Sequence, residues 1–121
     1  MDIIFGLDFG TTNSLVSLID RGTLLSLVNQ ETEAPHPSMF ILQGEEVKVG
    51  QSAKELANDA DEHAAGDVVR SPKIYLGDDD NQFPIPGRKD YHRVDISSAV
   101  LAHLVRDAEA RSVPFFLKKA V

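Results

Sequence analysis

A short apolar run at the start of the chain, residues 3–9, restricts the possible folds more than any other segment. Its β-forming residues and its sharp end at a glycine predict a buried strand. The next four residues, Gly10-Thr11-Thr12-Asn13, suit a tight turn, because glycine tolerates positive φ and because threonine and asparagine hydrogen-bond their own backbone. Two further apolar runs, residues 14–19 and 23–28, are separated only by a short polar break. Together the three runs predict an antiparallel meander.

The segment after the meander predicts a second group of elements. Pro35-His36-Pro37 is expected to end the meander, because neither proline can donate a hydrogen bond to a strand ladder. Residues 39–42 and 47–49 predict a hairpin around a polar turn. Residues 51–58 predict a short helix, with Ser52 available as its cap.

The second half of the chain divides into a polar stretch and a long helix. Residues 59–93 are mostly polar and predict loops. Apolar residues recur every four positions over residues 96–111 and form a wide stripe, which predicts an amphipathic helix. Asp95 is the expected N-cap of this helix and Pro114 is expected to mark its end. The chain ends on the apolar residue Val121 without a polar tail, so we expect further sequence to follow.

Composition excludes several classes of protein. The chain has 121 residues, of which 42% are hydrophobic, enough for one packed domain or part of one. The net charge of −7 argues against a general nucleic-acid binder, which would carry a basic face. The absence of cysteine excludes disulfides, thiolate metal ligands and a catalytic thiol. No apolar run approaches the roughly 18 residues of a membrane span and no secretion signal is evident, so a cytoplasmic protein is expected.

The first strand and its turn carry the residues best suited to chemistry. Backbone N–H groups at a tight glycine turn form a concavity that binds anions, and the hydroxyls of Thr11 and Thr12 can donate to phosphate oxygens. Asp8 is placed to hold Mg²⁺ through the waters that this ion releases reluctantly. The simpler alternative is an ordinary hairpin turn after a core strand. A protein-kinase interpretation of Asp8-Phe9-Gly10 fails, because neither a catalytic loop nor a glycine-rich loop precedes it.

The other polar clusters predict no site. Two acidic runs lack the pattern of a calcium-binding loop and are expected to be solvated. The four histidines lack the spacing of metal ligands and are expected to be partly exposed: His36, His63, His92 and His103.

Residues 4–16, which contain the glycine turn, resemble the first phosphate motif of the seventy-kilodalton heat-shock chaperones of the DnaK type, a family of the actin-like ATPase superfamily. The likeness continues in order along the chain. Pro37-Ser38 resembles a Thr-Pro-Ser step of that family, and residues 49–54 resemble its Val-Gly-Gln-x-Ala-Lys segment. Residues 73–77 resemble its Lys-Arg-Leu-Ile-Gly segment, and residues 96–109 resemble the helix before its second crossing strand.

The resemblance implies an α/β fold, the opening part of an actin-like (ribonuclease H-like) ATPase lobe with a mixed sheet, antiparallel hairpins and a long helix. Residues 1–121 would then be an incomplete nucleotide-binding domain. Within it, residues 1–38 would form a sheet subdomain and residues 39–112 a small subdomain over the cleft, and residues 113–121 would return toward the sheet.

The same resemblance implies an ATP-driven chaperone. Its nucleotide-binding domain would bind ATP or ADP with Mg²⁺ and hydrolyse ATP, and hydrolysis would control the binding of unfolded polypeptides. A J-domain co-chaperone and a nucleotide exchange factor are the other implied partners. The 121-residue piece alone is expected to bind MgATP very weakly and to show no turnover, because such chains supply a second phosphate loop and the adenosine pocket from later segments.

The resemblance also assigns roles to individual residues. Asp8 matches an aspartate that contacts the water shell of Mg²⁺. Lys73 matches a lysine that reaches the γ-phosphate and helps to place the attacking water, and fixed positive charge there would stabilise the transition state of phosphoryl transfer. The implied phosphate contacts come from the turn: Gly10, Thr11, Thr12 and Asn13.

The chain departs from the family pattern around the matched lysine. Ile74 and Asp78 stand where arginines are common, and Ser71-Pro72 precedes the lysine. Two alternatives therefore stay open. One is another actin-like ATPase or a sugar kinase, which also opens with a strand and an Asp-x-Gly-x-Thr hairpin. The other is a non-catalytic, chaperone-like module that binds a partner.

Overall fold

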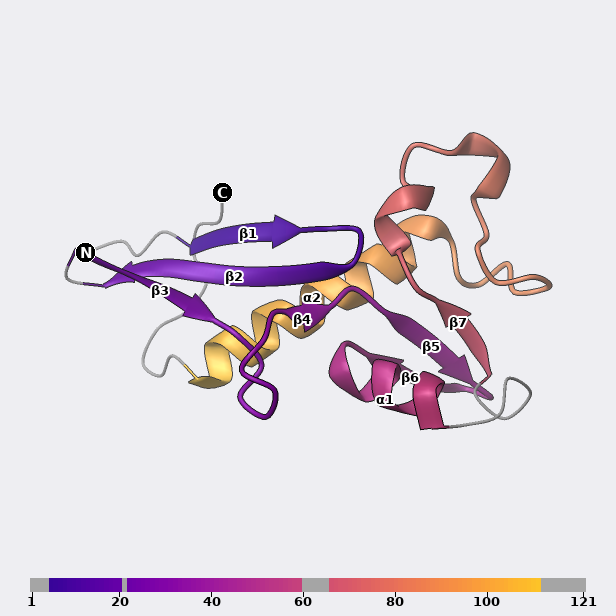
Figure 1. Cartoon of the computed structure of the whole chain (residues 1–121). Helices are drawn as coiled ribbons and strands as arrows, with labels where there is room; N and C mark the ends of the chain where they lie inside the picture. The colour runs from indigo at the N-terminus through magenta and orange to yellow at the C-terminus, as the bar shows by residue number, and fades with distance from the viewer. Residues whose placement is uncertain (1–4, 21, 60–65, 112–121) are drawn as a thin grey trace.

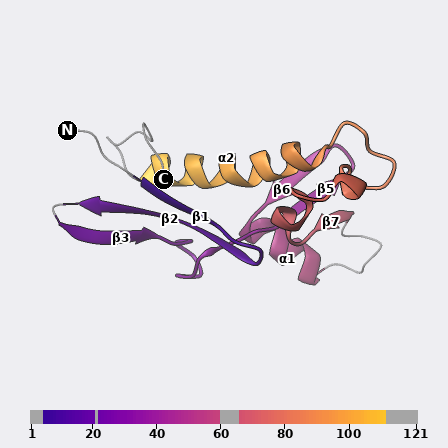
Figure 2. The ribbon, with the colours of Figure 1, turned by 90° about the horizontal axis from the view of Figure 1, so that it is seen from above.

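The structure, a computed structural model, describes residues 5–20, 22–59 and 66–111. Two small antiparallel sheets lie along one long helix, α2 (Arg93–Arg111), which runs past both (Figures 1 and 2). Among the described residues, none of the helices has the length and apolar character needed to cross a membrane. Helix α2 links the two sheets, because it buries side chains against each of them.

The first sheet contains the predicted meander. It is formed by β1 (Phe5–Phe9), β2 (Asn13–Asp20) and β3 (Thr23–Leu27) in that order, and β4 (His36–Pro37) pairs with β2. Alternate residues of the strands face α2, because side chains of a strand point to opposite faces in turn. The resulting core is made of Phe5, Val16 and Leu18 from the sheet and Leu104 and Ala108 from α2. The meander is confirmed.

The second sheet contains the predicted hairpin. It consists of β5 (Phe40–Gln43), β6 (Glu46–Val49) and β7 (Asp67–Val69), with β5 in the centre. Residues 40–42 of β5 are buried on both faces of the sheet, which explains their unbroken apolar sequence. Phe40 and Leu42 pack with Ile96 of α2, whereas Ile41 packs on the other face against Ala53 of α1 (Gln51–Asp59).

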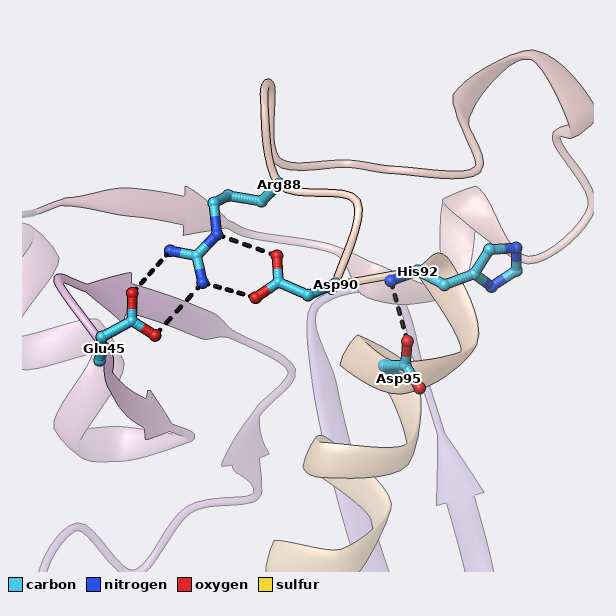
Figure 3. Close-up of polar contacts among 5 residues, drawn as sticks. All are labelled: Glu45, Arg88, Asp90, His92 and Asp95. Atoms are coloured by element: carbon cyan, nitrogen blue, oxygen red, sulfur yellow. Dashed lines mark hydrogen bonds and ion pairs between the residues drawn. The ribbon is translucent and has the colours of Figure 1, made fainter.

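The segment between β7 and α2 contains two short 3₁₀ helices, η1 (Pro72–Tyr75) and η2 (Asp79–Asn81). Charged contacts on the surface tie this segment to the rest of the molecule. The guanidinium of Arg88 contacts the carboxylates of both Glu45, in the β5–β6 turn, and Asp90, at 3.3 and 2.6 Å (Figure 3). The hydrogen bond from Arg88 lowers the pKa of Asp90 below its ordinary value. These partners are exposed, so solvent screens the attraction between them.

Two local predictions need correction. Proline does not exclude residues 36–37 from the sheet: Pro37 lies opposite Asn13 at a sheet edge, where no donor is required of it. Ser52 lies inside α1, and its hydroxyl donates to the carbonyl of Val49 at 3.2 Å instead of capping the helix. Every strand pair among the described residues is antiparallel, and the mixed sheet that the resemblance implies stays a prediction.

The start of α2 also differs from the prediction. The helix begins at Arg93, so Asp95 lies within its first turn and not at the N-cap. The carboxylate of Asp95 accepts a hydrogen bond from the His92 N–H at 2.9 Å (Figure 3), and His92 Nδ1 accepts one from the Val94 N–H at 3.2 Å. His92 is therefore the cap, and the two residues form a reciprocal capping pair. Pro114, the return over residues 113–121, and His63 lie outside the described residues.

Candidate functional site

The turn between β1 and β2 is closed by a hydrogen bond between its first and last residues. The Gly10 N–H donates to the carbonyl oxygen of Asn13 at 3.1 Å. A Cβ atom at Gly10 would lie 2.4 Å from that same oxygen, a distance that real Cβ atoms do not adopt. Only glycine therefore fits at this position without opening the turn.

The turn presents hydrogen-bond donors to its surroundings. Thr11, Thr12 and Asn13 are exposed. Within the described part of the chain, no group accepts a hydrogen bond from the N–H or the hydroxyl of Thr11 or Thr12. Free backbone N–H and hydroxyl donors at a turn are the kind of groups that bind anions in proteins, so the turn has the donors that the sequence analysis assigned to phosphate.

Strand β4 fixes the other side of the turn. The Ser38 N–H donates to the carbonyl oxygen of Thr12 at 2.9 Å, and Pro37 lies opposite Asn13. The hydroxyl oxygens of Ser14 and Ser38 lie 2.6 Å apart, and both residues are buried. The sequence predicted the turn but gave no signal for these contacts, since Ser38 is 24 residues away from Ser14 along the chain.

Asp8 lies on β1, two residues before the turn. It pairs with Leu15, and the alternation of the strand directs its exposed side chain away from the face that packs on α2. Its carboxylate has no protein partner in the ranges that the structure describes. A single exposed carboxylate beside a turn with free donors is compatible with a hydrated Mg²⁺, which takes its remaining ligands from water and phosphate. Among the same residues, no three His, Asp or Glu side chains are grouped to hold a metal ion by themselves.

Lys73 lies on η1, with an exposed side chain. The half-buried Tyr75 packs against the second core, the buried cluster that contains Phe40, Leu42 and Ile96. Pro72, at the start of this short helix, is buried. Figures 1 and 2 both draw η1 close to the turn end of the β1–β2 hairpin. The ammonium group of Lys73 makes no ion pair with a described acidic residue. Its role at a phosphate stays a prediction.

A buried histidine was missed by the sequence analysis. His36 is only 2% exposed, because β4 pairs with β2 and is covered by α2. Its Nε2 lies 3.2 Å from the carbonyl oxygen of Leu27 and 3.4 Å from a carboxylate oxygen of Asp107. Since both neighbours are acceptors, Nε2 carries the proton. The expectation of a partly exposed His36 is therefore wrong, and no local pattern indicated the distant pairing that buries it.

A polar cavity of about 330 Å³ lies beside this histidine, between the loop after β3, the start of α1 and α2. His103 and Asp107 line it on the side of α2, and the rings of His103 and His36 meet edge to face at 5.9 Å. Burial lowers the pKa of His103 below its usual 6.5, and the neighbouring His36 lowers it further. Asp107 acts in the opposite direction.

The family match and the most similar relatives among known proteins indicate the same family. Residues 4–82 match the family described as Hsp70 protein, a range that includes every predicted site residue. The chain is 34% identical to "Chaperone protein DnaK" of Mycoplasmopsis agalactiae over 110 residues, or 91% of this chain and 17% of the relative. It is 33% identical to the protein of the same name from Metamycoplasma hominis over 120 residues, or 99% of this chain and 19% of the relative.

A third such protein, from Mycoplasma mycoides subsp. mycoides, is 34% identical over 108 residues, or 89% of this chain and 17% of the relative. The chain thus spans less than a fifth of the length of these relatives. The family match covers more than half of the chain and the relatives cover nearly all of it. The chain belongs to the Hsp70 family.

Proposed function

We propose that this chain contributes the first phosphate-binding turn to the nucleotide-binding domain of an ATP-hydrolysing chaperone. The supporting observation is the turn itself: it is closed by the Gly10–Asn13 hydrogen bond, fixed from β4, and lined by exposed donors of Thr11 and Thr12 that no described group uses. Membership of the Hsp70 family supports the same function. ATP or ADP is the ligand that the proposal requires.

In this proposal each site residue has its own role in binding or hydrolysing the nucleotide. Thr11, Thr12 and Asn13 bind phosphate oxygens, and Asp8 orients the water shell of Mg²⁺. When bound, the ion neutralises negative charge on the phosphates. Lys73 supplies positive charge near the γ-phosphate and positions the attacking water.

The proposal extends to the whole protein. ATP hydrolysis controls the binding of unfolded polypeptides, a J-domain co-chaperone stimulates hydrolysis and an exchange factor releases ADP, all in the cytoplasm. Residues 1–38 and 39–112 act as the two subdomains that flank the nucleotide. A chain limited to residues 1–121 binds MgATP very weakly and shows no turnover, which calorimetry at micromolar nucleotide can test.

The test is single-turnover ATP hydrolysis by the full-length protein. Asp8→Asn and Lys73→Ala are each expected to lower the rate by about 100-fold, the usual order for losing one electrostatic contact to the transition state. Lys54→Ala is the matched control, because Lys54 is an exposed lysine on α1 whose ammonium group contacts no described acidic residue. If both site variants keep the wild-type rate, the catalytic assignment fails and a non-catalytic binding module is the better interpretation.

A second measurement separates the chaperone from a sugar kinase. Unfolded peptide is expected to stimulate ATP hydrolysis by the full-length protein, whereas simple sugars are not. Phosphorylation of a sugar without any response to peptide would contradict the chaperone assignment and leave the phosphate-binding turn in place.

A further inference from the structure

Ser38 makes two hydrogen bonds to the chain around the phosphate-binding turn, one to Thr12 in the turn and one to Ser14 after it. Its N–H donates to the carbonyl oxygen of Thr12 at 2.9 Å, and its hydroxyl oxygen lies 2.6 Å from that of Ser14. Ser38 is 0% exposed and Ser14 is 1% exposed. One residue after β4 is therefore bonded to the chain both inside the turn and just after it.

The bond to Thr12 determines the direction of a second backbone group. The Thr12 carbonyl and the Asn13 N–H belong to one planar trans peptide, in which the two groups point in opposite directions. Because the Ser38 N–H holds the Thr12 carbonyl toward β4, it turns the Asn13 N–H away from β4. The Asn13 N–H is one of the groups that the proposed function assigns to phosphate.

The bond between the hydroxyls holds Ser38 in place. Each hydroxyl has one proton and two lone pairs, so one serine donates and the other accepts. The contact excludes water because both residues are buried, and a buried polar group that loses its partner has no substitute. The Ser14–Ser38 contact therefore maintains the register of β4 against the turn.

We infer that Ser38 is a positioning residue for the phosphate-binding turn: it orients the Thr12–Asn13 peptide without touching the nucleotide. The inference rests on the proposed function, since it concerns the same turn. Ser38 is completely buried, and its hydrogen bonds in the described part of the chain go to Ser14 and Thr12.

The test compares nucleotide affinity with fold stability in the full-length protein. Ser38→Ala removes the hydroxyl and leaves that of Ser14 without its partner, so both the Tm and the affinity for MgADP are expected to fall. In the double variant Ser14→Ala/Ser38→Ala no hydroxyl is left unpaired, so the Tm is expected to recover toward that of the wild type. The affinity for MgADP is expected to stay about tenfold weaker, because the hydroxyl contact that holds Ser38 in place against the turn is still missing.

Ser97→Ala is the matched control. Ser97 is a buried serine on α2, 4% exposed, whose hydroxyl has no partner in the described part of the chain. Its replacement removes a buried serine hydroxyl without touching the turn. Wild-type affinity for MgADP is therefore expected in this variant.

Amide hydrogen exchange in the nucleotide-free protein gives a readout that does not depend on nucleotide binding. The N–H groups of Gly10 and Ser38, which donate to Asn13 and Thr12, are expected to exchange faster in the double variant than in the wild type. A double variant with wild-type affinity and wild-type exchange would overturn the inference. Wild-type protein that binds no MgADP would instead refute the proposed function, and the exchange rates would still show whether Ser38 holds the turn.

Discussion

The two segments that carry the predicted site residues are held in different ways. The turn at residues 10–13 is bonded within itself and to the buried Ser38, which directly follows β4. The segment that carries Lys73 is attached by the buried Pro72 and the half-buried Tyr75, while Ile74 next to the lysine is 59% exposed. A buried hydrogen-bond network fixes atoms more closely than a few apolar contacts do. We therefore expect the turn to determine affinity for nucleotide and the Lys73 segment to determine the rate of hydrolysis.

The largest effect should come from a substitution that forces the turn open. Gly10→Ala places a Cβ atom 2.4 Å from the Asn13 oxygen, so the turn must open and its closing hydrogen bond is lost. We expect at least a 100-fold loss of MgADP affinity, about 2.8 kcal/mol, and a loss of stability of about 1–3 kcal/mol. Calorimetry and thermal unfolding measure the two quantities. The control is Gly77→Ala, where a Cβ atom meets nothing within 4 Å, and equal losses in both variants would remove the special role of the turn.

A smaller effect is expected from loosening the Lys73 segment. Tyr75→Ala removes a half-buried side chain from the second core and should cost about 1–3 kcal/mol of stability. The hydrolysis rate should fall by about tenfold while affinity for MgADP stays within about twofold, because Lys73 loses its support and the turn does not. The matched control is Ile74→Ala on the same helix, whose exposed side chain supports nothing in the described core. A drop in affinity as large as the drop in rate would show that the two segments are not separable.

Acid should weaken the junction between the two sheets, where His103 lies. Its pKa is lowered by burial and by His36, and is raised by Asp107, so the charged form is disfavoured in the folded protein. The unfolded chain then binds more protons than the folded chain below pH 6.5, and stability falls as the pH is lowered through that value. Above pH 6.5 this contribution is constant.

The check is Tm against pH for the wild type and for His103→Gln. The glutamine variant should lose less stability than the wild type between pH 7 and pH 5. Because His103 is only partly buried, the difference should be smaller than the effect of either substitution above. Parallel curves for the two proteins would assign the acid sensitivity to another group.

The local patterns of the sequence were enough to predict the elements but not their contacts. The three strands of the meander, the hairpin around Gly44 and the long helix each followed from apolar periodicity and turn residues, which are properties of neighbouring residues. The position of β4 did not, because proline has no donor and the pairing of Pro37 with Asn13 depends on a partner 24 residues away. The burial of His36 was missed for the same reason.

The same division applies to the candidate site. Asp8 and residues 10–13 are contiguous, so a strand and a turn were sufficient to place them together. Ser38 and Lys73 come from distant segments. Lys73 was singled out only through the family resemblance, and Ser38 entered that resemblance without a role, since nothing in its neighbours indicates a bond to Thr12.

The smallest effect should come from Arg88. Its side chain ties the segment between β7 and α2, which also carries Lys73, to the β5–β6 turn. Its contacts with Glu45 and Asp90 lie at the surface, where solvent and salt screen them (Figure 3). Arg88→Gln should lower the Tm by no more than a few degrees at low ionic strength and by less in about 1 M salt. Lys89→Gln, which removes an adjacent exposed charge without described partners, should leave the Tm unchanged. If Arg88→Gln instead unfolds the protein or lowers the affinity for MgADP by about tenfold, the segment between β7 and α2 is held by charge, and it is not independent of the turn.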